Sequence, residues 1–101
     1  MNENRRLTVH YTQLAPARPG SPLAEEWEFY RREAGRLLAE GNEGKHILIK
    51  GTTILGIWDT FDEAYAEGCK RFLHLRVPFM VHQILTEEPL LKSGYNKLCR
   101  N

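Results

Sequence analysis

The stretch that decides the fold is KHILIKGTTILGIW, residues 45–58. It consists of two apolar, β-branched runs, 45–50 and 53–58, separated by Gly51 and Thr52. A two-residue connection with glycine first suits a type II′ turn, so the pattern predicts a tight antiparallel hairpin.

The register of this hairpin decides which side chains share a face. A two-residue turn gives these expected pairs: Ile49–Ile54, Leu48–Leu55 and Ile47–Gly56. One face then carries Ile47, Ile49, Ile54 and Trp58, and the other carries Leu48, Leu55 and Ile57. Because both faces are apolar, we expect each of them to be covered by a helix, by the C-terminal tail or by a partner chain.

A helix over 60–74 is expected directly after the hairpin, covering one of these faces. Thr60 and Glu63 fit a capping box at its start. Lys70 and Arg71 place positive charge near its C-terminal end, where the helix dipole favours it.

A third strand is predicted over 79–85, after Pro78 bars further helix. Strand–helix–strand connections are right-handed, so this strand should run parallel to 53–58. The simplest arrangement is a mixed three-stranded sheet with 45–50 in the middle.

The first helix is predicted over 22–40, with Ser21 as its cap and Pro22 at its first position. Its apolar stripe contains residue types that are enriched at interaction hot spots. Together with two aromatic residues elsewhere, these are the interaction candidates: Trp27, Tyr30, Arg31, Leu37, Trp58 and Tyr95.

The expected organisation is one domain over 22–88 between two end segments. Residues 1–21 form a proline-containing flexible arm, in which the alternating run 7–12 favours a short strand. Residues 89–101 form a C-terminal tail that packs on its own domain or on a partner. The fold class is therefore a small α+β fold of two or three layers, with two helices and three strands.

Composition bounds the function classes. The chain has 101 residues and a mass of 11.7 kDa, and its 14 basic and 13 acidic residues give a net charge of +1. This balance excludes a strongly basic nucleic-acid binder. The sequence contains no secretory leader and no apolar run that could span a bilayer, so we expect a cytoplasmic protein with no membrane partner. Cys69 and Cys99 are then expected to be reduced.

Motifs for catalysis, phosphate binding or metal binding are missing from the sequence. The glycines do not form a phosphate-binding loop, and the four histidines lack paired metal-ligand spacing. His46 and His82 fall on neighbouring strands, where we expect two half-buried histidines; a shared carboxylate would instead indicate catalysis. We predict no enzyme, no cofactor, no metal and no small-molecule substrate.

The quoted hairpin and the segments after it also carry a resemblance. The segments are EGKHILI at 43–49, GIWDTFDEA at 56–64 and PFMVHQI at 78–84. This layout resembles a group of small uncharacterised bacterial domains over about residues 43–85. The resemblance implies a bacterial cytoplasmic protein and brings no known activity.

The sequence is compatible with two functions. The first is a non-enzymatic protein-interaction module, a homodimer or partner subunit, that binds through a sheet face or edge with help from the arm or tail. The alternative is a single-stranded nucleic-acid binder, in which Trp58 and Phe79 stack bases. Its cations would be Lys45, Lys50, Lys70, Arg71 and Arg76.

Overall fold

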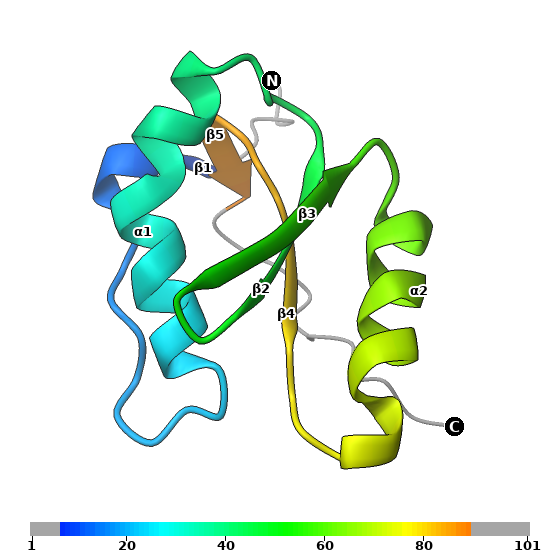
Figure 1. Cartoon of the computed structure of the whole chain (residues 1–101). Coiled ribbons are helices and arrows are strands. Elements are labelled where there is room, and N and C mark those ends of the chain that lie inside the picture. The colour runs from blue at the N-terminus through cyan, green and yellow to red at the C-terminus, as the bar shows by residue number, and fades with distance from the viewer. Residues whose placement is uncertain (1–6, 90–101) are drawn as a thin grey trace.

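A three-stranded sheet lies between two helices in the computed structural model, which describes residues 7–89 (Figure 1). The strands are β2 (His46–Lys50), β3 (Thr53–Trp58) and β4 (Met80–Gln83). Helix α1 (Ala24–Ala39) covers one face of this sheet and α2 (Phe61–Phe72) covers the other. The prediction of a small α+β fold with two helices is confirmed, and both sheet faces are covered by the chain itself.

The strand order is β3-β2-β4, so the first strand of the hairpin is in the middle, as predicted. Both hydrogen-bonded pairs are antiparallel. The sheet is therefore antiparallel rather than mixed. The two strands that α2 connects do run in the same direction, but β2 lies between them and they do not pair. The handedness of the connection stays a prediction.

The hairpin register follows the prediction only next to the turn. Ile49 pairs with Ile54 as expected, and Gly51 has a positive φ of 63° in the turn. Beyond this point a β-bulge shifts the register by one residue, so that Leu48 pairs with Gly56 rather than with Leu55. Side chains of β3 that follow the bulge consequently change face.

The bulge moves Ile57 to the α1 side of the sheet and Trp58 to the α2 side. Ile57 pairs with Ile47 and packs against the core below α1. Trp58 pairs with His46, whose ring meets Phe61 of α2. The expected grouping of Trp58 with Ile47 is therefore wrong, because the prediction assumed an uninterrupted ladder.

The larger core lies between α1 and the sheet. It consists of the buried residues Leu14, Tyr30, Ala34, Leu37, Ile47, Ile49, Met80 and Ile84. Leu14 comes from the arm, which was expected to be flexible, yet its side chain is only 7% exposed. The arm thus completes the core on this side.

The α2 side is built from aromatic rings around Phe79. Tyr65 and Phe72 of α2 lie 6.0 and 5.8 Å from its ring. Gly68 allows this approach, because a Cβ at that position would collide with the Phe79 ring. Leu48, which is fully buried, fills the same side of the central strand.

Helix α2 begins as the sequence predicts. Both hydrogen bonds of the capping box between Thr60 and Glu63 are present. The predicted helix over 60–74 ends earlier, at Phe72, and a short 3-10 helix, η2 (Leu73–Leu75), follows. Residue Arg76 then closes this turn with a left-handed backbone, φ 57°.

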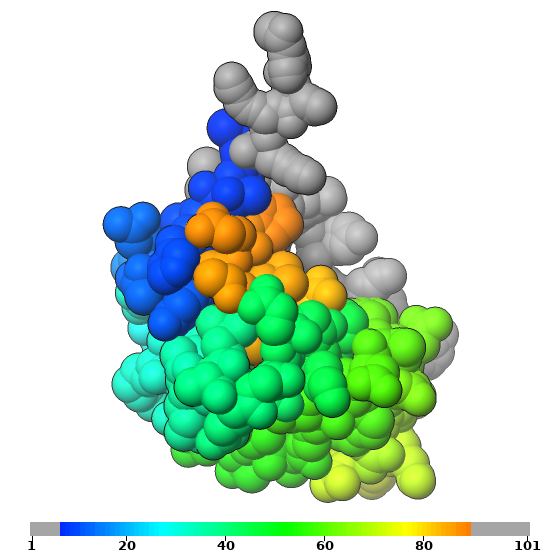
Figure 2. Space-filling model, turned by 90° about the horizontal axis from the view of Figure 1, so that it is seen from above, coloured from blue at the N-terminus to red at the C-terminus, as the bar shows by residue number. Residues whose placement is uncertain are grey.

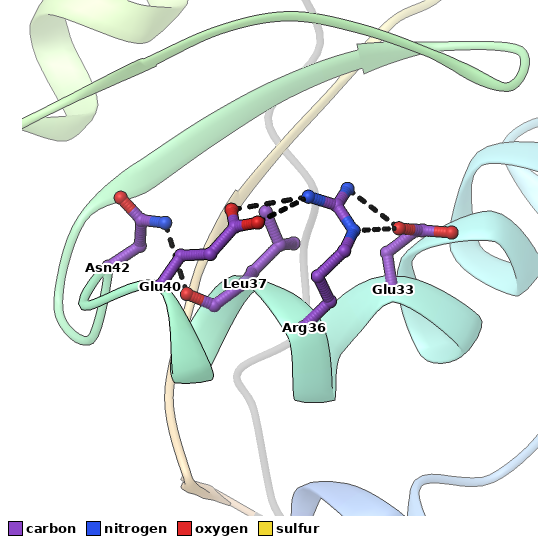
Figure 3. A network of polar contacts seen from close by, with 5 residues as sticks. All are labelled: Glu33, Arg36, Leu37, Glu40 and Asn42. Atoms are coloured by element: carbon purple, nitrogen blue, oxygen red, sulfur yellow. Dashed lines mark hydrogen bonds and ion pairs between the residues drawn. The ribbon is translucent and has the colours of Figure 1, made fainter.

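Helix α1 is capped only at its C-terminal end. Its first residue is Ala24 rather than Pro22, and no side chain caps the start. At the other end, the Asn42 side chain and backbone both donate to the Leu37 carbonyl oxygen (Figure 3). Arg36 bridges Glu33 and Glu40 on the exposed surface beside this cap.

A second, two-stranded sheet joins the arm to the end of the described chain. Strand β1 (Thr8–His10) falls within the predicted run 7–12 and pairs with β5 (Glu87–Pro89), which the sequence did not predict. A short 3-10 helix, η1 (Tyr11–Gln13), follows β1. Figure 2 shows β1 and β5 side by side above the end of α1. The predicted tail, from residue 90 on, lies outside the described residues.

Candidate functional site

Strand β3 forms one edge of the three-stranded sheet and is the strand nearest the viewer in Figure 1. Within residues 7–89, no strand pairs with its outer side. Its six residues, TILGIW, include no charged residue and no proline. From Ile54 to Trp58 every residue is partly exposed. In the described part of the chain, the edge therefore presents backbone groups that no strand pairs with, beside apolar side chains.

Trp58 lies at the end of this edge, and its indole ring folds back along the strand. A Cβ at Gly56 would collide with the Trp58 ring, so the glycine makes room for it. Trp58 is only partly buried. Of the five interaction candidates that fall within residues 7–89, it is the one that lies on an edge strand of the sheet.

The candidates on α1 are placed differently. Tyr30 and Leu37 are 0% and 1% exposed, because their side chains lie in the core between α1 and the sheet. Neither can meet a partner while the domain stays folded. Tyr95, the sixth candidate, lies outside the described residues.

Trp27 and Arg31 contact the arm of the same chain. The Trp27 indole Nε1–H donates to the Ala15 carbonyl oxygen at 2.8 Å. The Arg31 Nε–H donates to the Leu14 carbonyl oxygen at 3.1 Å. The surface of α1 that looked available to a partner is therefore occupied by an internal segment.

A buried polar cluster lies where α1, β4 and β5 meet. The Glu88 carboxylate, only 2% exposed, accepts from His82 Nε2 at 2.9 and 3.0 Å and from the Tyr30 hydroxyl at 3.4 Å. An ionised carboxylate can only accept, and with such a carboxylate Nε2 of His82 is the ring nitrogen that carries the hydrogen. Trp27 closes the cluster, with its ring 5.3 Å from that of His82.

The environment of this cluster disfavours charge on the tyrosine. Burial raises the pKa of Tyr30 well above its ordinary value, and the neighbouring Glu88 carboxylate raises it further. Tyr30 therefore stays a neutral donor to the carboxylate. The cluster joins residues 58 positions apart in the chain, so it ties β5 to α1. No sequence pattern identified Glu88, because glutamate is ordinarily exposed.

His46 and His82 are both partly buried on neighbouring strands, as expected, but they lie on opposite faces of the sheet. His82 faces α1, where it pairs across the ladder with Ile47, and His46 faces α2. His46 Nδ1 is buried and has no hydrogen-bond partner among residues 7–89. Among the described residues no three metal-binding side chains come together.

The surface expected to stack nucleic-acid bases is not formed by residues 7–89. Phe79 is 6% exposed and lies beneath α2. Three of the five candidate cations face carboxylates within 4 Å: Lys45–Asp59, Lys50–Glu26 and Arg71–Glu67. These pairs reduce the positive potential that a phosphate backbone would need.

Cys69 is disulfide-bonded, so the expectation of a reduced thiol at this position is wrong. Cys99 lies outside the described residues. Neither described helix has the length and apolar character needed to cross a bilayer.

Comparison of the chain with protein-family models, with curated proteins and with solved structures gave no match. The resemblance to small bacterial domains therefore stays a prediction.

Proposed function

We propose that the protein is a non-enzymatic protein-interaction module that binds an extended strand of a partner along the free edge of β3. The observation that carries this proposal is the uncharged, partly exposed edge from Thr53 to Trp58. Strand addition satisfies the unpaired backbone groups of such an edge, and pockets beside it select the side chains. The partner is a second copy of the chain or another protein.

Proteins that avoid edge pairing place lysine, another charge or proline on exposed edge strands. β3 has none of these over its whole length. β4, the opposite edge, is shorter, and its Met80 is buried in the core. This difference favours β3 as the binding edge.

Two features of β3 indicate how long the added partner strand is and where it is anchored. The bulge after Ile54 increases the local twist, so the added strand should be short. Trp58 is a large, partly exposed aromatic residue at the end of the edge, where it can serve as an anchor for the partner. Both sheet faces carry helices, so the edge is the part of the sheet left to bind.

The proposal is tested by placing a charge on the edge. Leu55 is partly exposed and lies outside the core on the α1 side, so Leu55→Lys should leave the domain folded. Light scattering over rising concentration, and capture of partners from lysate, are compared for the wild-type and variant chains. We expect Leu55→Lys to abolish association at the edge.

The matched control is Ala66→Lys, which adds the same charge at an exposed position on α2. It should associate like the wild-type chain. A wild-type chain that stays monomeric at high concentration and captures no partner would contradict the proposal. Equal loss of association in both lysine variants would also contradict it, because a general charge effect would then be responsible.

A further inference from the structure

The arm contacts α1 in the manner of a bound peptide that places one side chain in the core. From Thr12 to Gly20, only Leu14 is buried and only Ala17 is half-buried; the other seven residues are exposed. One anchoring side chain with exposed neighbours is the pattern of a segment held on a surface from one side. Leu14 alone enters the core.

Recognition of this segment is directed at its main chain. Three polar contacts to the main chain come from side chains of α1. Trp27 donates to the Ala15 carbonyl, Arg31 donates to the Leu14 carbonyl, and Glu28 accepts from the Ala17 N–H at 2.6 Å. The Ala17 hydrogen bond lowers the pKa of Glu28, which keeps its carboxylate charged. Arg31 also contacts Glu28 and so holds the acceptor in place.

The backbone of the segment has the conformation that proline-rich ligands adopt. Leu14 has φ −63° and ψ 138°, close to the polyproline II values. Ala15 precedes Pro16 and is restricted to the same extended region. Recognition of such segments relies on aromatic side chains against a preformed extended backbone. Trp27 is the aromatic residue that reaches the segment here, and its indole N–H donates to the carbonyl oxygen of Ala15, the residue before the proline.

We infer that the face of α1 formed by Trp27, Glu28 and Arg31 is a binding site for an extended, proline-containing segment with an anchoring leucine, and that the arm of a second copy can occupy it in place of the chain's own arm. The occupant seen in the structure indicates the specificity: a buried Leu14 side chain and the main chain between Leu14 and Ala17, which Pro16 restricts to an extended form. This site lies on α1 and is separate from the β3 edge.

The chain's own arm competes with a free peptide for the α1 face and so lowers the apparent affinity of that peptide. A tethered segment acts at an effective concentration on the order of millimolar, so a free peptide should bind the wild-type chain weakly. Leu14→Asp places a charge on the anchor and should release the arm from the face. The released face should bind a labelled synthetic peptide of residues 7–20 at least about tenfold more tightly than the wild-type chain does.

Three controls separate recognition from a general loss of structure. Gln13→Asp adds the same charge at an exposed arm position and should leave peptide affinity at the wild-type level. A peptide carrying Leu14→Asp should not bind. Trp27→Phe, added to the Leu14→Asp chain, removes the indole donor and should weaken binding about fivefold, the equivalent of one hydrogen bond.

A complementation experiment tests the second copy directly and does not depend on the peptide. The Leu14→Asp chain has a free face, and an Arg31→Met chain has an intact arm with a weakened face. Both chains carry Leu55→Lys, so that association along β3 does not contribute. We expect their mixture to form a 1:1 heterodimer by light scattering, while each chain alone stays monomeric.

A folded Leu14→Asp chain that binds no peptide would overturn the inference, as would a mixture that stays monomeric. If Leu14→Asp unfolds the chain, amide hydrogen exchange of the wild-type protein tests instead whether the peptide displaces the arm. Excess peptide should then speed exchange of the Ala17 amide, which its own Glu28 normally holds. Unchanged exchange at Ala17 would overturn the inference. None of these results bears on the edge of β3.

Discussion

The α2 side of the sheet is packed mainly with apolar and aromatic side chains, whereas on the α1 side buried polar side chains connect distant segments. Phe79 packs against Gly68 on the first side. On the second, Glu26 accepts from the Gly51 N–H, 25 positions away, and Glu88 contacts Tyr30 across 58 positions. The α1 side therefore holds the hairpin turn, β5 and the arm in place, and α2 serves mainly to cover the sheet.

The largest expected loss of stability comes from a cavity on the α2 side of the sheet. Leu48 is fully buried on the central strand. Leu48→Ala removes packed atoms and leaves a cavity, so we expect a loss of about 2–5 kcal/mol in the free energy of unfolding. Urea denaturation measures this loss. Leu7→Ala, at a residue that is 56% exposed, should change the unfolding free energy by less than about 0.5 kcal/mol.

The next effect comes from the polar cluster on the α1 side. Glu88→Gln keeps the size of the side chain but weakens its bonds to His82 and Tyr30, and should cost about 1–3 kcal/mol. The change should be local, with faster amide exchange in β1 and β5 and unchanged exchange in α2. An exposed glutamate on α1 provides the control variant, Glu25→Gln. Equal destabilisation of α2 would contradict the division between the two sides.

A smaller effect is expected at the start of α2. Thr60→Ala removes the side-chain half of the capping box and should cost about 1 kcal/mol. Amide exchange should rise in the first turn of α2 and remain unchanged at the Ala17 amide on the α1 side. Exchange that rises equally on both sides would show that the two helices unfold together.

The smallest effect appears only in alkali and reports on Tyr30. Burial raises the pKa of this phenol in the folded state, whereas the unfolded chain ionises near 10.0. The raised pKa therefore contributes stability that is complete below pH 10 and is lost as the pH rises further. The unfolding free energy of the wild-type chain should fall above pH 10, and that of Tyr30→Phe should fall less. Parallel curves would contradict the burial of this group.

Local signals explain which parts of the fold were predictable. The capping box at Thr60, the two-residue turn at Gly51 and the apolar runs on either side each depend on neighbours in sequence, and all three are present in the structure. The bulge was missed, although an isolated glycine inside a strand, Gly56, often accompanies one. The extra residue of the bulge is Leu55, which has no pairing partner in β2, and its insertion decides that Ile57 rather than Trp58 faces α1.

The long-range contacts had no comparable signal. β5 is a three-residue strand that contains two glutamates and a proline, a composition that disfavours strands. Glu26 and Glu88 are buried although acidic residues are ordinarily exposed. Tyr30 and Leu37 looked like surface anchors because an apolar stripe does not reveal whether it meets the chain itself or a partner. The arm that covers Trp27 and Arg31 could not be placed from its own sequence.

The central claim, that a partner strand adds to the edge of β3, is tested most directly by amide hydrogen exchange along β3 in the dilute and the associated protein. An added strand forms hydrogen bonds with backbone groups that β2 leaves free. We therefore predict that amides between Thr53 and Trp58 gain protection on association, that Leu55→Lys abolishes this gain, and that Ala66→Lys retains it. Association without any gain of protection in β3 would contradict the claim.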